Sequence, residues 1–204
     1  MKITVVGAGN VGATAANILA EKEVGNSIIL LDVIKGLAEG KSLDIMQMSP
    51  LALFDTKTIG VTDDYEATSD SSVVIITSGL SRKPGMNRED LITANAKIVK
   101  NVTENIIKYS PGAIIIVVSN PLDAMSYVAY KSAKIASERV IGMAGLLDTA
   151  RYRSFLAEEL DCSVKDIQAI TLGGHGGQMV PLMKYTTLSG VPIKQLLPER
   201  TINE

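Results

Sequence analysis

The sequence predicts an α/β fold with a doubly wound parallel sheet, because three of its features agree. Short, continuously apolar runs alternate with longer amphipathic runs along the chain. The apolar runs are typical of strands buried on both faces of a parallel sheet, and the amphipathic runs of the helices that cover those faces. A glycine-rich loop also follows the first apolar run. Pattern alone equally allows another α/β sheet, such as a flavodoxin-like one.

Six strands and five helices are expected in alternation. The predicted strands are residues 3–6, 28–31, 58–61, 73–77, 114–118 and 139–142. The predicted helices are residues 11–22, 36–48 and 88–109, one that Asn120 and Pro121 cap and that runs to Ala136, and residues 146–161. Pro50 is expected to end the second helix, since proline removes a helical hydrogen bond. Two further β-like runs lie near residues 167–172 and 180–185.

Composition favours a packed domain that binds a small molecule. Hydrophobic residues make up 46% and charged residues 21% of 204, with a net charge of −2. Without a basic surface for a phosphate backbone, nucleic acid is not an expected partner. The longest apolar run, residues 113–118, is too short to cross a membrane, and no signal peptide is expected. The single cysteine, Cys162, allows no internal disulfide and fits a cytoplasmic location.

The glycine-rich loop predicts a dinucleotide site. It reads Gly7-Ala8-Gly9-Asn10-Val11-Gly12 and joins the first predicted strand to the first predicted helix. Gly7 would allow the tight turn, Gly9 the approach of a pyrophosphate to the backbone, and Gly12 close packing of helix on strand. The helix N-terminus would then present free N–H groups to the anion. Glycines also mark plain turns, so this pattern is weak without its context.

Asp32 supplies that context and indicates which dinucleotide binds. It ends the second predicted strand, about 20 residues beyond the last glycine, where a carboxylate binds the adenosine ribose hydroxyls. The alternative is a solvated residue at a strand end. Asp32 would repel a 2′-phosphate, and the following Val33 and Ile34 offer no cation to offset it. We therefore expect NAD rather than NADP.

A loop with several cations follows the fourth predicted strand. Residues 78–88 include Arg82, Lys83 and Arg88 among glycines and a proline. Ligands of doubly wound sheets bind beyond the carboxyl ends of strands, so this loop is expected at the active-site crevice. A guanidinium binds a carboxylate through two parallel hydrogen bonds, which an ammonium cannot do. A solvated basic loop is the alternative.

His175 is the only histidine and has two glycines on each side. An imidazole titrates near neutrality, which suits it to accept an alcohol proton as hydride leaves carbon. A structural hydrogen bond is the usual alternative for a lone histidine. Asp148 and Arg151 are three residues apart on a predicted helix and share one face, either to orient an imidazole and bind a carboxylate or as a surface ion pair. With one histidine and one cysteine, no metal site is expected.

Six segments, in order along the chain, resemble the malate dehydrogenases of the lactate dehydrogenase-like group. They are residues 6–12, 30–32, 82–91, 118–123, 142–151 and 173–176. The resemblance implies a Rossmann NAD-binding domain at residues 1–145 and the first part of an α+β catalytic domain at residues 146–204. It also implies NAD as cofactor, malate and oxaloacetate as substrates, and a homo-oligomer.

The resemblance further implies the role of each site residue. His175 would accept the proton, paired with Asp148, while Arg151 would bind the carboxylate beside the reacting carbon. Arg88 would polarise the carbonyl oxygen of oxaloacetate, and Arg82 would bind the distal carboxylate. Asn120 would also contact the substrate. Four residues would lie near the nicotinamide half of NAD: Asn95, Val118, Ser119 and Asn120.

Two departures from the family stand out. Gly177 replaces the aspartate that usually follows the His-Gly pair, so we expect looser placement of His175. Chains of the family are about half as long again, so we expect this chain to be part of a longer one, with weak or no activity by itself.

Three alternative functions remain open. The first is a lactate or other 2-hydroxy acid dehydrogenase, in which the position of Arg82 is typically glutamine. The second is a short-chain dehydrogenase, because Tyr127 and Lys131 have the spacing of that family's catalytic pair. The third is an NAD-binding module without turnover.

Overall fold

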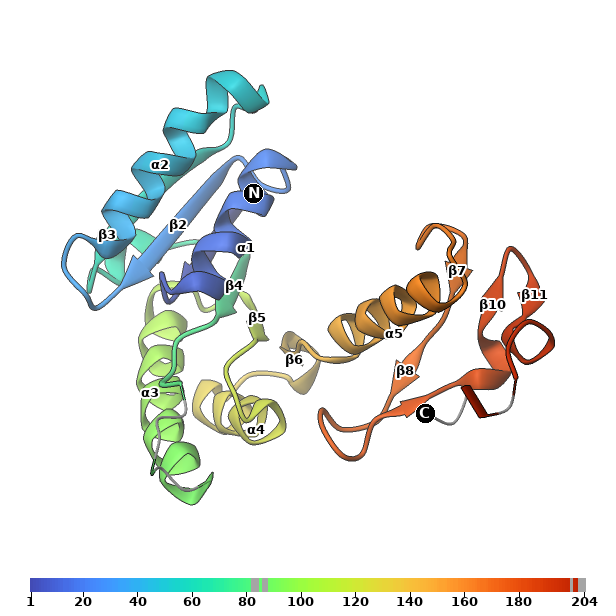
Figure 1. Cartoon of the computed structure of the whole chain (residues 1–204). Coiled ribbons are helices and arrows are strands. Elements are labelled where there is room, and N and C mark those ends of the chain that lie inside the picture. Colours follow the sequence, from blue (N-terminus) through green and yellow to red (C-terminus); the bar gives the residue numbers. More distant parts are fainter. Residues whose placement is uncertain (82–84, 86–87, 199, 202–204) are drawn as a thin grey trace. The chain divides into compact units, whose positions relative to one another are not determined.

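The computed structural model describes residues 1–81, 85, 88–198 and 200–201, and of Arg88 only the backbone. The chain forms two compact units, Met1–Gly142 and Met143–Glu204. Figure 1 shows the elements of both units in sequence colours. Each unit is described below by itself.

The first unit contains a six-stranded parallel sheet. Its strands are β1 (Lys2–Val6), β2 (Ser27–Asp32), β3 (Lys57–Thr62), β4 (Val73–Ile76), β5 (Ile114–Val117) and β6 (Val140–Gly142). They lie in the order β3-β2-β1-β4-β5-β6, and every neighbouring pair is parallel. This is the strand order of a Rossmann fold, whose crevice lies beside β1 where the order reverses. The predicted doubly wound sheet and its six strands are confirmed.

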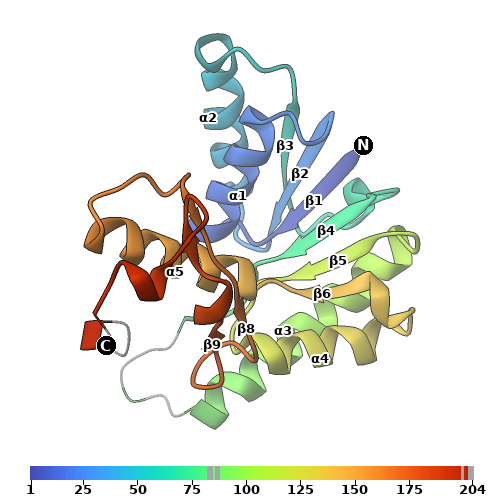
Figure 2. The ribbon, with the colours of Figure 1, turned by 90° about the vertical axis from the view of Figure 1, so that its right-hand side faces the viewer.

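Helices cover both faces of this sheet. They are α1 (Asn10–Glu21), α2 (Leu37–Ala52), α3 (Arg88–Tyr109) and α4 (Leu122–Ala133), with single 3₁₀ turns at η1 (Glu66–Thr68) and η2 (Ser137–Arg139). Figure 2 shows α1 and α2 along one face and α3 and α4 along the other. Val5, Ile28 and Leu30 are fully buried beneath α1 and α2. This two-sided burial explains why β1 and β2, at the centre of the sheet, are buried along nearly their whole length.

Pro50 does not end α2 as predicted. The helix continues through it to Ala52 and stops at Leu53, whose φ of 58° is left-handed and whose N–H donates to the Ser49 carbonyl over 2.8 Å. Because Pro50 lies in the last turn, the single hydrogen bond that it removes is lost where the helix is about to end.

The second unit packs one helix against short strands. It contains α5 (Gly145–Glu159), β7 (Ile167–Gln168), β8 (Thr171–Leu172), β9 (Val180–Pro181), β10 (Thr187–Leu188), β11 (Val191–Pro192), η3 (Met183–Tyr185) and η4 (Ile193–Gln195). Sheets β11-β10-β7 and β8-β9 are both antiparallel. Leu156, Ile167 and Ile193 form the centre of its apolar core.

Both predicted β-like runs in the second unit differ from the structure. Residues 167–172 split between two sheets, since β7 pairs with β10 and β8 with β9. Residues 183–185 form a 3₁₀ turn rather than a strand. Two-residue strands carry too little periodicity for a pattern to divide them correctly.

No helix in the described part of the chain is long and apolar enough to cross a membrane.

Candidate active site

The glycine loop closes tightly against β2 and α1. Gly7 has a φ of +104°, and its N–H donates to the Leu31 carbonyl over 2.7 Å. A Cβ on Gly12 would overlap the Gly7 carbonyl oxygen, so only glycine allows α1 to approach this closely. Gly9, the residue before α1, has open space where a Cβ would lie. The loop is thus packed on one side and free on the side that a pyrophosphate would occupy.

Asp32 lies at the carboxyl end of β2 and contacts the glycine loop directly. Its Oδ2 accepts a hydrogen bond from the Ala8 N–H over 2.6 Å, and its Oδ1 accepts one from the Ile34 N–H over 2.9 Å. The carboxylate is therefore held in place by backbone donors. Each oxygen keeps further acceptor capacity, which hydroxyl groups of a ribose can use.

A cavity of about 400 Å³ opens between the glycine loop and the ends of the central strands. It is lined by Val6, Gly7, Gly9, Leu31, Asp32, Val33, Ile34, Leu37, Tyr65, Ser78, Gly79, Leu80, Ile98, Asn101 and Val102. Mostly apolar walls beside one carboxylate suit a flat heterocycle joined to a sugar. The cavity lies at the switch point of the sheet, where doubly wound folds bind their ligands.

Tyr65 lines this cavity, and the sequence analysis missed it. Burial raises the pKa of the Tyr65 phenol to about 12, with smaller contributions from the negative charges of Asp63 and Asp32. The phenol therefore stays neutral and adds no charge beside Asp32. A usable signal was present, because Tyr65 closely follows β3 and ligand contacts gather at the carboxyl ends of strands.

Asn95, Ser119 and Asn120 lie together beyond β4 and β5. Asn95 is buried in α3, where its Nδ2 donates to the carbonyls of Asn120 over 2.7 Å and Leu80 over 3.2 Å. Its Oδ1 accepts from the Leu80 N–H over 2.7 Å. Ser119 Oγ donates to the Ser78 carbonyl over 2.6 Å. Asn95 thus joins two loops through its whole amide, a role that the sequence analysis did not assign.

Other predicted residues of the first unit lie at the ends of β5, α1 and α3. Val118 directly follows β5, and its N–H donates to the Ile76 carbonyl over 2.9 Å. Asn10 and Val11 begin α1, with Val11 59% exposed. Arg88 is the first residue of α3, and its side chain, like all of Arg82, lies outside the described residues.

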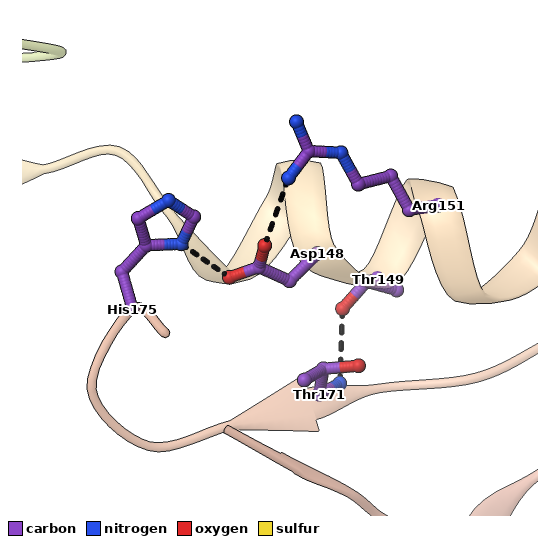
Figure 3. Close-up of polar contacts among 5 residues, drawn as sticks. All are labelled: Asp148, Thr149, Arg151, Thr171 and His175. Atoms are coloured by element: carbon purple, nitrogen blue, oxygen red, sulfur yellow. Dashed lines mark hydrogen bonds and ion pairs between the residues drawn. The ribbon is translucent and has the colours of Figure 1, made fainter. Parts of the chain in front are cut away.

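His175, Asp148 and Arg151 come together in the second unit (Figure 3). His175 Nδ1 lies 2.9 Å from Asp148 Oδ2, and Arg151 Nη1 lies 3.6 Å from Asp148 Oδ1. Asp148 is 6% exposed and the Arg151 side chain 59% exposed, so the i,i+3 ion pair between them joins a buried carboxylate to an exposed guanidinium. An ionised carboxylate only accepts hydrogen bonds, so Nδ1 donates and Nε2 keeps a lone pair for a proton.

The loop that carries His175 is short and closed. Gly173 has a φ of +98°, and a Cβ there would overlap the Gln178 carbonyl oxygen. The Met179 N–H donates to the Gly176 carbonyl over 3.1 Å. At Gly177 a Cβ would meet nothing within 4 Å, so the position of the family's usual aspartate has room for a side chain.

No cluster of three or more metal-ligating side chains exists within the described ranges. Tyr127 is 61% exposed on α4, and Lys131 Nζ lies 5.3 Å from its ring centre, so this pair forms an exposed cation–π contact.

Comparison with known proteins extends over the whole chain. Residues 1–142 match the lactate/malate dehydrogenase NAD binding domain, and residues 146–204 match the lactate/malate dehydrogenase alpha/beta C-terminal domain. The chain belongs to the lactate/malate dehydrogenase family. Membership confirms the predicted family and NAD-binding domain, and it rules out the short-chain dehydrogenase alternative.

Two relatives within the lactate/malate dehydrogenase family are malate dehydrogenases. The chain is 61% identical over 203 residues to a malate dehydrogenase of Cytophaga hutchinsonii and 55% identical over 203 residues to one of Chlorobium limicola. These matches cover all of this chain and 65% of each relative. The chain therefore spans about 65% of the length of these relatives.

Solved structures of the family agree with the fold. The malate dehydrogenase of Salinibacter ruber superimposes with a TM-score of 0.94 at 50% identity, covering 100% of this chain and 64% of that one. A lactate dehydrogenase of Cryptosporidium parvum, solved with lactic acid and nicotinamide adenine dinucleotide, gives 0.89 at 36% identity and covers 96% and 61%.

Proposed function

We propose that the protein containing this chain is an NAD-dependent malate dehydrogenase that interconverts (S)-malate and oxaloacetate. The observation that carries the proposal is the 2.9 Å contact between His175 Nδ1 and the buried carboxylate of Asp148. This contact leaves Nε2 ready to take the proton of an alcohol as its carbon is oxidised. The names of the nearby relatives support malate as the alcohol.

The first unit would bind NAD through groups that fit its parts. The free face of Gly9 and the start of α1 would receive the pyrophosphate, and Asp32 the ribose hydroxyls. The mostly apolar cavity beside Tyr65 would hold the adenine. The backbone of residues 118–120 and Asn95 would lie near the nicotinamide half. Bound NAD supplies the acceptor for the hydride that leaves C2 of malate.

The chain's own residues would handle the substrate's charges and its proton. As C2 loses its hydride and the C–O bond becomes a carbonyl, the hydroxyl proton moves to Nε2 of His175. Asp148 stabilises the resulting imidazolium through Nδ1. We assign the carboxylate beside C2 to Arg151, the carbonyl oxygen to Arg88, the distal carboxylate to Arg82 and a further contact to Asn120.

The organisation of the protein is part of the same proposal. We assign residues 1–145 to the NAD-binding domain and residues 146–204 to the first part of the catalytic domain, close to the two matched regions. We also propose a cytoplasmic homo-oligomer. The free thiol of Cys162 supports the reducing location, and the exposed Leu43, Leu51 and Leu53 support an apolar subunit interface.

Arg82 provides the test that separates malate from lactate chemistry. We expect a higher kcat/KM for oxaloacetate than for pyruvate, and Arg82→Gln should lower the oxaloacetate value by on the order of 100-fold, since a second carboxylate is left unpaired. Arg82→Lys, which keeps the charge without the planar fork, should give an intermediate value. NADH binding, followed by fluorescence on the same samples, should not change.

Two results would contradict the proposal. A preference of the unchanged protein for pyruvate would favour a lactate dehydrogenase. NADH binding with no turnover of either keto acid would favour an NAD-binding module.

A further inference from the structure

We propose that Thr149 is a positioning residue for His175, because its hydroxyl holds the base of the histidine loop against α5. The Thr171 N–H donates to Thr149 Oγ1 over 2.9 Å (Figure 3). The inference rests on the proposed function, in which His175 exchanges a proton with the substrate. It adds a residue that touches neither substrate nor cofactor.

Two contacts join the same two segments. Asp148 and Thr149 are consecutive on α5. Thr171 begins β8, and His175 lies four residues later, in the middle of the loop between β8 and β9. Asp148 holds the imidazole over 2.9 Å, and Thr149 holds the strand that leads to it over the same distance. A displacement of β8 along α5 would therefore break both contacts together.

The ladder of β8 and β9 explains why Thr171 needs a partner on α5. Thr171 lies opposite Pro181, and the Leu182 N–H donates to the Ile170 carbonyl over 2.9 Å. Because backbone groups of successive residues in an antiparallel strand alternate in direction, the Thr171 N–H points away from β9. Thr171 is 5% exposed, so water is largely excluded from this N–H. The Thr149 hydroxyl provides its acceptor, as buried N–H groups require.

The start of α5 also lies near the carbonyl of Thr171. A Cβ built on Gly145 would come 3.4 Å from the Thr171 carbonyl oxygen, so little space separates the first turn of the helix from this residue. The N–H and the carbonyl of one residue in an antiparallel strand point to the same side, so both backbone groups of Thr171 face away from β9. The hydrogen bond to Thr149 is thus made where β8 runs beside the helix.

The glycines around His175 make such a fixed base necessary. Gly173, Gly174, Gly176 and Gly177 leave the loop backbone with many accessible conformations. The imidazole then depends on contacts at the loop's tip and base. Asp148 provides the first and Thr149 the second.

The test compares Thr149→Val, which keeps the branched shape without the hydroxyl, with Thr149→Ser, which keeps the hydroxyl. Thr187→Val is the matched control. It also removes one threonine hydrogen bond in the same unit, the one that Thr187 Oγ1 donates to Gln168 Oε1 over 2.9 Å. The ring ¹⁵N signals of His175 are assigned by comparison with a His175→Gln protein. They report which ring nitrogen carries the proton, independently of any turnover.

We expect Thr149→Val to raise the hydrogen-exchange rate of the Thr171 amide at least about tenfold and to reduce the share of the Nδ1–H tautomer. The kcat for oxaloacetate reduction should fall about 10- to 100-fold at unchanged KM for NADH, since small displacements of a catalytic group cost this much. Thr149→Ser should restore all three quantities, and Thr187→Val should leave them unchanged.

Two outcomes would overturn the inference. One is a Thr149→Val protein with unchanged ring signals and unchanged Thr171 exchange, and the other is a Thr149→Ser protein as impaired as Thr149→Val. If the unchanged protein reduces no oxaloacetate, the proposed function fails, while the ring and amide signals still decide the role of Thr149. Should Thr149→Val not fold, Thr149→Ala removes the hydroxyl without the branched bulk and carries the same expectations.

Discussion

At the scale of single residues, burial decides what Asp148 does. The sequence allowed either an exposed ion pair with Arg151 or a partnership with His175. In the structure the carboxylate is buried, Arg151 is 59% exposed at its side chain, and the histidine contact is the shorter one. A buried carboxylate is stable when hydrogen-bonded donors compensate its charge. Asp148 therefore orients the imidazole of His175, while the exposed guanidinium of Arg151 keeps N–H donors for an external anion.

Tyr65 gives a prediction in alkaline solution. Its pKa is raised from 10.0 to about 12 in the folded protein, mainly by burial. Because the folded state disfavours the phenolate, the stability that this group contributes is complete below pH 10 and is lost as the pH rises toward 12. The free energy of unfolding of the unchanged protein should therefore fall more steeply between pH 10.0 and about pH 12 than that of Tyr65→Phe.

Urea unfolding at a series of pH values measures both proteins. Identical slopes for the unchanged protein and Tyr65→Phe would show that the phenol ionises freely in the folded state.

At the scale of elements, the regular parts of the fold were predictable and the long-range side-chain contacts were not. Apolar runs and the bounds of α3 followed from local pattern, as did the glycine loop. Asn95 was assigned to the cofactor, yet its amide joins backbones 15 and 25 residues away, and no local pattern carries such pairings. The β10–β11 hairpin was missed although Ser189 and Gly190, both at positive φ, mark its turn.

The glycine loop yields a prediction in which stability and binding separate. Gly9→Ala places a methyl group in open space, so folding stability should stay within about 0.5 kcal/mol while NADH affinity falls by on the order of tenfold or more. Gly12→Ala forces α1 away from the Gly7 carbonyl, so both stability and affinity should fall, stability by about 1–3 kcal/mol. Thermal melts and NADH fluorescence titrations measure the two quantities.

Gly40→Ala is the control for this pair. Gly40 lies inside α2 with nothing within 4 Å of an added Cβ. The change should raise stability by about 0.4–1 kcal/mol and leave NADH affinity unchanged. If the Gly9→Ala protein bound NADH as tightly as the unchanged protein, the pyrophosphate could not bind at the open side of the loop.

At the scale of the whole molecule, each unit contains an apolar core of its own. One core lies under α1 and α2 around Val5 and Leu30, and the other gathers Leu156, Ile167 and Ile193. The predicted chemistry is divided in the same way. The groups proposed to bind NAD lie in the first unit, and His175, Asp148 and Arg151 lie in the second.

This division predicts different consequences for two equally buried isoleucines. Ile193 and Ile28 are both 0% exposed, and truncation of either to alanine should cost about 2–5 kcal/mol in its own core. Ile193→Ala should raise amide hydrogen exchange in α5 and β7 and lower oxaloacetate reduction, with NADH affinity within about twofold of the unchanged protein. Ile28→Ala should instead raise exchange in β1 and β2 and weaken NADH binding. If Ile193→Ala weakened NADH binding as much as Ile28→Ala, the two cores would unfold as one cooperative unit, and the division of binding and proton transfer between them would not hold energetically.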